Sequence, residues 1–189
     1  MNIRDYVKAG FEAHYNRFNE VSEDGFCRWM RPGVPNSMRV TPNDEEWAVW
    51  KLVPSTVTEE DIHQLEEEFG LTFPEWYRAF ISVYHHYFDD IPEQGLDEPL
   101  DDIRLMYNPL LCKHGYLPFS WDSEYGCIMC IDLNGGADEE QQAIYQIDHE
   151  ILFDFEEDAA REQLQASLQY LYPNFKTYFD QQFVNPITR

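Results

Sequence analysis

The sequence predicts an α+β fold, in which a block of strands lies between helices. Helical patterns with capping residues occupy the segments before residue 88 and after residue 157, and alternating apolar segments bounded by turn residues lie between them. Strands and helices do not alternate strictly, so a parallel sheet of βαβ units is not expected. We therefore predict a central mixed, largely antiparallel sheet of about four to six strands, with helices packed before and after it and an N-terminal helical extension.

A change of composition divides the chain into an N-terminal extension, residues 1–45, and a single main domain, residues 46–189. Residues 1–43 hold six basic and five acidic side chains, whereas the remainder holds seven and 31. Turn-forming residues gather just before the change, at 31–37. The apolar residues of the extension recur at helical spacing: Ile3, Tyr6, Val7, Phe11, Tyr15 and Phe18. We expect this face to pack on the main domain, and a helix that binds a partner is the alternative.

The main domain begins with a short strand or extended arm that ends at Pro54 and carries Trp47, Trp50, Leu52 and Val53. A helix is then predicted from Thr58, a favoured N-cap residue, to Gly70, which suits the left-handed conformation after a last helical turn. The acidic residues 59–61 suit the positive end of the helix dipole. Three apolar residues mark its inward face: Ile62, Leu65 and Phe69.

A second helix is predicted to begin at Pro74, because proline is favoured at the first helical position. Its aromatic stripe is expected in the core and consists of Tyr77, Phe80, Ile81, Tyr84 and Phe88. A solvated acidic loop is predicted at 89–102, where proline and glycine interrupt the pattern. The remaining segments are predicted to form three strands, at 116–119, 126–133 and 143–148, and two helices, at 157–170 and after Pro173.

The formal net charge of −23 indicates which partners the protein can have. A repulsive field opposes phosphate groups, so direct binding of nucleic acid or anionic membranes is not expected, and the favoured partners are basic. Three acidic blocks, at 44–68, 89–104 and 138–162, hold 26 of the 36 acidic residues. Hydrophobic residues make up 43% of the chain and aromatic residues 16%, which indicates a folded body and not a disordered acidic chain.

The sequence also predicts a cytoplasmic location. No apolar run approaches the ~20 residues that a membrane span needs, and the first residues lack the basic and apolar regions of a secretory signal. The four cysteines, Cys27, Cys112, Cys127 and Cys130, are too few and too irregularly spaced for a disulfide scaffold. We expect a reduced cytoplasmic protein that is monomeric or weakly dimeric.

Cys127 and Cys130 form a C-x-x-C pair, which is a weak signal for a metal or redox site. On a strand, an offset of three residues puts the two thiols on opposite faces, about 10 Å apart along the chain. They could then neither share a metal ion nor form a disulfide. We expect both to be structural cysteines.

A helix would also bring His85 and Asp89 onto one face, where they could bind a divalent ion, with His86 and Asp90 beside them. A third ligand is not evident, so this site stays open. The segment 148–150, Asp-His-Glu, could form an acid–base cluster, but a binding or structural role is favoured. G-x-S-x-G, Walker-type and H-E-x-x-H motifs are missing from the sequence. We therefore predict no catalytic residues, no metal and no cofactor.

The order of these signals resembles the SUKH superfamily of Smi/Knr-type domains over roughly residues 47–183. Its opening signature is matched by Trp50-Lys51-Leu52-Val53-Pro54, Thr58-Glu59-Glu60-Asp61-Ile62, Phe69-Gly70-Leu71, Phe73-Pro74 and Tyr77-Arg78-Ala79-Phe80-Ile81. A second block is matched by Leu117-Pro118-Phe119-Ser120-Trp121-Asp122, the 126–133 segment and Ile144-Tyr145-Gln146-Ile147-Asp148-His149-Glu150, and the closing helix by Phe175-Lys176-Thr177-Tyr178-Phe179. The fungal founders of the family regulate cell-wall synthesis, and the many bacterial members are immunity proteins.

The resemblance implies a non-enzymatic immunity protein that neutralises a basic toxin domain of the nuclease or deaminase type. Aromatic residues among charges are typical of protein interfaces. The expected apolar anchors are Trp47, Trp50, Trp121 and Tyr125, and the expected phosphate-mimicking carboxylates are Asp122, Glu124, Asp148 and Glu150. Two alternatives remain: a regulatory scaffold like the fungal members, and a metal-assisted hydrolase that uses His85, Asp89 and Asp148.

Overall fold

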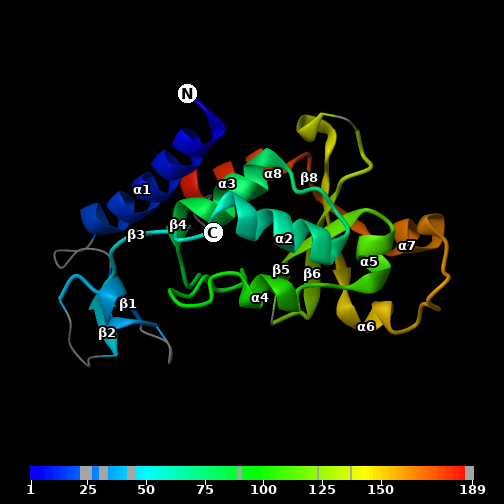
Figure 1. Ribbon diagram of the computed structural model, residues 1–189, viewed down its shortest axis with the longest axis horizontal. Coiled ribbons are helices and arrows are strands. Elements are labelled where there is room, and N and C mark those ends of the chain that lie inside the picture. Colours follow the sequence, from blue (N-terminus) through cyan, green and yellow to red (C-terminus); the bar gives the residue numbers. More distant parts are fainter. Residues whose placement is uncertain are drawn as a thin grey trace.

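The computed structural model describes residues 1–21, 27–29, 34–41, 46–88, 91–122, 124–136 and 138–185, with the backbone alone at 18–21 and 27–29. It confirms the α+β class, with helices gathered around an antiparallel sheet (Figure 1). None of the described helices combines the length and the apolar character that a bilayer span requires.

The central sheet has four strands in the order β5-β6-β7-β8, and every neighbouring pair is antiparallel. The strands are β5 (Tyr116–Asp122), β6 (Cys127–Asp132), β7 (Ile144–Asp148) and β8 (Gln169–Tyr172). The first three correspond to the predicted strands. The last was not predicted: part of it lies in the segment expected to continue a helix to residue 170. That helix, α7 (Arg161–Ser167), ends earlier because residues 169–172 pair with β7.

One face of the sheet is covered by long helices from both ends of the main domain. These are α2 (Glu59–Phe69), α3 (Glu75–Val83) and α8 (Phe175–Phe179), the last continuing into the π-helical turn η3 (Asp180–Val184). The aromatic rings of Phe119 on β5 and Phe175 on α8 lie 5.4 Å apart, and the ring of Tyr77 on α3 lies 6.1 Å from that of Phe119. Edge-to-face aromatic contacts therefore join α3 and α8 to the sheet.

The opposite face of the sheet is covered by a second, smaller apolar cluster. It contains Leu111 of α5 (Pro109–Lys113) and Leu164 of α7 together with Tyr116, Ile128, Cys130 and Ile147 of the strands. Because both faces are buried, polar side chains of the sheet are accessible mainly at its two ends.

The N-terminal helix α1 (Ile3–Val21) packs against α3 and η3, as its apolar spacing predicts (Figure 1). Val7, Phe11 and Tyr15 are buried in the main cluster, while the side chain of Phe18 lies outside the described residues. The ring of Phe11 lies 5.4 Å from that of Phe80 and 5.1 Å from that of Phe183. The packing of this helix on the main domain is confirmed, and the domain boundary at residue 45 stays a prediction.

Helix α2 begins and ends where the sequence predicts. Thr58 and Asp61 form a capping box, with the backbone N–H of Thr58 donating to Asp61 Oδ2 at 2.8 Å, and Gly70 adopts φ = 65°. The last turn carries Glu66, which is buried. Its Oε1 accepts the backbone N–H of Phe73 at 2.7 Å and Nη1 of Arg78 at 2.8 Å. One carboxylate thus holds the turn between α2 and α3.

The second helix departs from its prediction at both ends. Pro74 is the N-cap of α3 instead of its first residue, and the helix ends at Val83 instead of near Phe88. Tyr84 and His85 form strand β4 (Tyr84–His85), which pairs with β3 (Val53–Pro54). The aromatic stripe is nevertheless buried throughout, as expected.

The segment after β4 is less solvated than predicted. Gln94 is fully buried and its Nε2 donates to the carbonyl of Ile81 at 2.7 Å, and Leu100 is also buried. The remaining elements are β1 (Cys27–Trp29) and β2 (Trp47–Val49), which pair with each other, η1 (Asn36–Met38), α4 (Asp101–Leu105), η2 (Glu139–Gln141) and α6 (His149–Leu152).

A partly buried ion pair fastens α7 to the end of β6. Arg161 Nη2 donates to both carboxylate oxygens of Asp132, at 2.7 and 2.8 Å, and its Nη1 donates to the carbonyl of His114. The guanidinium group also lies over the ring of Tyr116, 4.3 Å from its centroid. Asp132 is only 4% exposed, so its charge depends on this partner.

We expect Asp132→Asn to lower the free energy of unfolding by about 2 kcal/mol, because it leaves the partly buried Arg161 charge without its carboxylate. The control is Glu162→Gln on the same helix, an exposed site where we expect less than about 0.5 kcal/mol. Urea denaturation of both variants measures the difference, and equal losses would contradict a specific role of the pair.

His85 makes stability depend on pH. The backbone N–H of Thr56 donates to its Nε2 at 3.1 Å, and Nδ1 donates to the carbonyl of Gln94 at 3.2 Å. Burial lowers the pKa of His85 below its usual 6.5. The folded state therefore keeps the ring neutral, whereas the unfolded chain takes up a proton as the pH falls below that value, and stability is lost in this range.

His85→Gln keeps one donor and one acceptor but cannot titrate. We expect this variant to lose about 1 kcal/mol less stability than the wild type for each pH unit below about 6.5. Denaturant titrations at about pH 7.5 and about pH 5.5 measure the two losses, and identical losses would exclude His85 as their source.

Candidate functional site

Strand pairing brings two of the predicted carboxylates together at one end of the sheet. Asp122 is opposite Cys127 in the β5–β6 ladder, and Cys127 is opposite Asp148 in the β6–β7 ladder. Burial and the charges of these two neighbours raise the pKa of the Cys127 thiol. The thiol therefore stays protonated, which disfavours a nucleophilic role.

Both carboxylates are oriented by backbone donors. Asp122 Oδ1 accepts the N–H of Glu124 at 2.9 Å and that of Tyr125 at 3.1 Å. Asp148 is the N-cap of α6, and its Oδ1 accepts the N–H of Glu150 at 2.9 Å. Among the described residues, the second oxygen of each carboxylate has no donor, so it is available to a partner.

His149 links the two loops that carry these acids. Its backbone N–H and its Nδ1 both donate to the carbonyl of Gly126, at 2.9 and 2.8 Å. Gly126 adopts φ = 67°, and a Cβ atom placed on it would lie 2.7 Å from His149 Nδ1. The ring of His149 also contacts that of Trp121, with centroids 4.9 Å apart. Glycine is therefore required here for both conformation and space.

Exposed aromatic side chains lie among these acids. Tyr125 is 69% exposed and Phe153, at the end of α6, is 82% exposed. The rings of Phe153 and His149 lie 6.1 Å apart, so Phe153 belongs to the same surface. We call this group of residues the sheet-end surface: Trp121, Asp122, Glu124, Tyr125, Asp148, Glu150 and Phe153.

Phe153 was not among the predicted site residues. The available signal was an apolar run, Ile151-Leu152-Phe153, within the acidic segment 150–158. Periodicity cannot tell which members of such a short run face solvent. The structure shows that Leu152 packs on the smaller cluster, while Phe153 projects into solvent.

The two tryptophans predicted near the start of the main domain do not join this surface. Trp50 is only 3% exposed and its ring packs against that of Tyr87, with centroids 6.4 Å apart, so the expectation of an exposed anchor is wrong. Trp47 is 58% exposed but lies on β2. In Figure 1 the β1–β2 ladder lies at the left end of the molecule and α6 at the lower right.

The helix that would have placed His85 and Asp89 on one face, the alternative considered for a metal site, ends at Val83, before His85. His85 lies on strand β4 and not on a helix, and both of its ring nitrogens have protein partners. Asp89 and Asp90 lie outside the described residues, and the ring of His86 packs against that of Phe88 at 5.1 Å. The described residues hold no group of three or more His, Cys, Asp or Glu side chains placed to bind a metal ion.

The C-x-x-C cysteines lie as strand geometry predicts. Cys130 is fully buried in the smaller cluster, whereas Cys127, three residues earlier on β6, lies half-buried at the sheet end. Both thiols are free, as is that of Cys112. Burial raises the pKa of the Cys112 thiol to about 11 and also raises that of Cys130. These environments are typical of structural cysteines.

Comparison with known families gives one match. Residues 56–181 match the model of the family described as SMI1 / KNR4 family (SUKH-1). The matched range contains α2 through α8 and the whole sheet-end surface, and it begins after α1, β1 and β2. No curated protein matches the chain.

We expect Gly126→Ala to destabilise the protein more than Gly70→Ala. Both glycines have positive φ, and alanine there costs roughly 1–2 kcal/mol. A Cβ atom at Gly70 would meet nothing within 4 Å, whereas at Gly126 it would collide with His149. The extra cost at Gly126 should be about 1 kcal/mol or more.

Denaturation of Gly126→Ala and of Gly70→Ala measures this difference. A double variant that carries Gly126→Ala and His149→Ala, compared with each of these two single variants, identifies its source. If the collision is the cause, the combined variant loses less stability than the sum of the single losses. Strict additivity would contradict it.

Proposed function

The chain belongs to the SMI1 / KNR4 (SUKH-1) family, and we propose that it is a non-enzymatic immunity protein that binds and neutralises a basic toxin domain. The proposed target is a toxin of the nuclease or deaminase type. The observation that carries the proposal is the sheet-end surface, where exposed aromatic rings lie among carboxylates held in fixed orientations.

The chemistry of this surface suits a protein partner that is basic. Interfaces derive much of their binding energy from a few aromatic anchors surrounded by polar groups. Tyr125 and Phe153 are exposed enough to serve as anchors, and Trp121 is half-buried next to His149. Glu124 and Glu150 are exposed at the margin, where they can meet lysine and arginine side chains.

The orientation of the acids supports mimicry of phosphate groups. A nuclease domain is basic because it must hold phosphates, so carboxylates in similar positions can occupy its groove. Asp122 and Asp148 each use one oxygen to hold the following backbone, and within the described residues the other oxygen has no hydrogen-bond donor. Since these bonds already hold the two carboxylates, less side-chain conformational entropy is lost on binding.

The net charge of −23 supports rapid capture of a basic toxin. Electrostatic steering raises association rates by about 10–10³-fold at low ionic strength. The free thiols of Cys112, Cys127 and Cys130 suit a reducing compartment, and we propose that the protein acts in the cytoplasm as a monomer or weak dimer.

The first test is a pull-down from the source lysate at low salt, eluted in salt steps and analysed by mass spectrometry. One basic partner with a nuclease-like or deaminase-like domain supports the immunity role. Several partners from signalling or cell-wall pathways would favour a regulatory scaffold instead.

With the partner in hand, we expect Glu150→Lys to slow association about tenfold more than Glu60→Lys. Both sites are exposed and both variants change the net charge equally, but Glu60 lies on α2, outside the sheet-end surface. Stopped-flow association rates measure the effect. The difference should shrink as salt is raised to about 0.5 M, because screening shortens the range of the charges. Equal slowing by both variants would point to a general field and contradict binding at this surface.

A further inference from the structure

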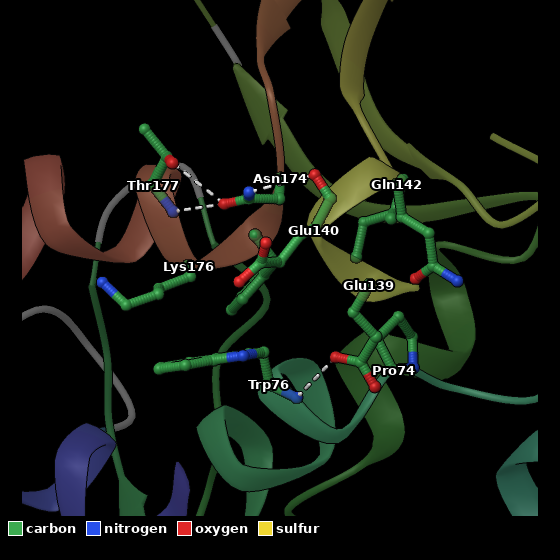
Figure 2. Close-up of a pocket in the computed structure, with 10 residues that line it drawn as sticks. Pro74, Trp76, Glu139, Glu140, Gln142, Asn174, Lys176 and Thr177 are labelled. Carbon is green, nitrogen blue, oxygen red and sulfur yellow. Dashed lines mark hydrogen bonds between the residues drawn. The ribbon is translucent and has the colours of Figure 1, made fainter. Parts of the chain in front are cut away.

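A cavity of about 250 Å³ opens at the opposite end of β6 and β7 from the sheet-end surface (Figure 2). Its apolar lining comes from Pro74 and Trp76 at the start of α3, Ile131 of β6 and Phe175 of α8. Its polar lining includes Glu140 of η2 and Gln142. The cavity thus combines an aromatic wall with oxygen acceptors, and the function proposed above does not use it.

The walls of the cavity are held together by hydrogen bonds between segments far apart in the sequence. The carboxylate of Glu139 accepts the backbone N–H groups of Glu75 at 2.6 Å and Trp76 at 3.3 Å, which joins η2 to α3. Asn174 Nδ2 donates to the carbonyl of Glu140 at 3.2 Å, which joins η2 to the start of α8. The cavity is therefore formed before any ligand binds.

The charged groups around the cavity leave one carboxylate available. Lys176 Nζ donates to Asp180 Oδ2 at 2.5 Å, and in Figure 2 its side chain points away from Glu140. Glu139 is occupied by the start of α3. Within the described residues, the carboxylate of Glu140 has no hydrogen bond or ion pair, and the buried Oε1 of Gln142 has no donor. Both groups are acceptors.

Trp76 supplies a face for a planar cation. Its ring forms one wall of the cavity, with the side chain of Glu140 above it in Figure 2. The same ring already attracts one cation, since Lys176 Nζ lies 5.7 Å from its centroid. A guanidinium group stacks on indole rings, carries several donors in one plane and is weakly hydrated, so it suits an aromatic wall beside acceptors.

We propose that this cavity binds a guanidinium group, stacked on Trp76 and donating to the carboxylate of Glu140. The group can come from a small molecule or from an arginine side chain of a protein. The proposal does not depend on the toxin-binding role, because its site and its test involve neither the toxin nor the sheet-end surface.

The experiment titrates the full chain with agmatine, N-acetyl-L-arginine amide and butylamine by calorimetry, while the Trp76 indole N–H signal is followed by NMR. Glu140→Gln removes the available charge at an exposed position and should leave the fold intact. Glu162→Gln is the matched control, with the same charge change at an exposed position on α7, outside the cavity and the sheet-end surface. We expect saturable guanidinium binding that shifts the Trp76 signal, weakens about tenfold in Glu140→Gln and is unchanged in the control.

Tighter binding of agmatine than of the arginine amide supports a small-molecule ligand, and the reverse order supports an arginine side chain. Three outcomes would overturn the proposal: no saturable binding of either guanidinium probe, equal binding in Glu140→Gln and Glu162→Gln, or binding of butylamine as tight as that of agmatine. The first two would exclude the cavity as the site, and the third would exclude guanidinium selectivity.

Discussion

The rest of the structure depends on the burial of both faces of the four-stranded sheet. Helices α2, α3 and α8 cover one face with aromatic side chains, and α5 and α7 cover the other with a smaller apolar cluster. A polar group between these layers needs a partner, as Asp132 has in Arg161. Accessible chemistry is therefore concentrated at the ends of the strands. The sheet-end surface lies at one end of β6 and β7 and the guanidinium cavity at the other.

The strong negative charge of the surface follows from how the few basic residues are used. In the main domain, Arg78, Arg104, Arg161 and Lys176 all pair with carboxylates of the same chain. These pairs lie at the α2–α3 turn, between α4 and α2, between α7 and β6, and within the C-terminal helix. Each of these four basic groups neutralises only the carboxylate that it contacts, so the excess of acidic residues, 36 against 13 basic ones, stays uncompensated. A basic partner then meets a field that is not neutralised locally.

The candidate site could be predicted in part, because turn chemistry is local. Asp122 and Asp148 end strands that the sequence already indicates, and short polar residues at such positions hold the following backbone N–H groups. Their closeness across β6 required the register of two ladders, which no local pattern specifies. Solvent exposure was harder to predict than strand position, because it depends on neighbours distant in sequence. Trp50 is buried, whereas Phe153 is exposed.

By itself the sequence determined the features whose energy is local. Helix α2 begins at a capping box and ends at a glycine, three strands are bounded by turn residues, and the net charge is −23. Only the tertiary structure decided where pairing between distant segments overrides helical propensity. Helix α3 stops at Val83 because residues 84–85 pair with β3, and α7 gives way to β8 because residues 169–172 pair with β7. The physical reason is that strand pairing is stabilised by hydrogen bonds and burial between segments far apart in the sequence. These segments come into contact only when the chain folds, so a local pattern does not specify them.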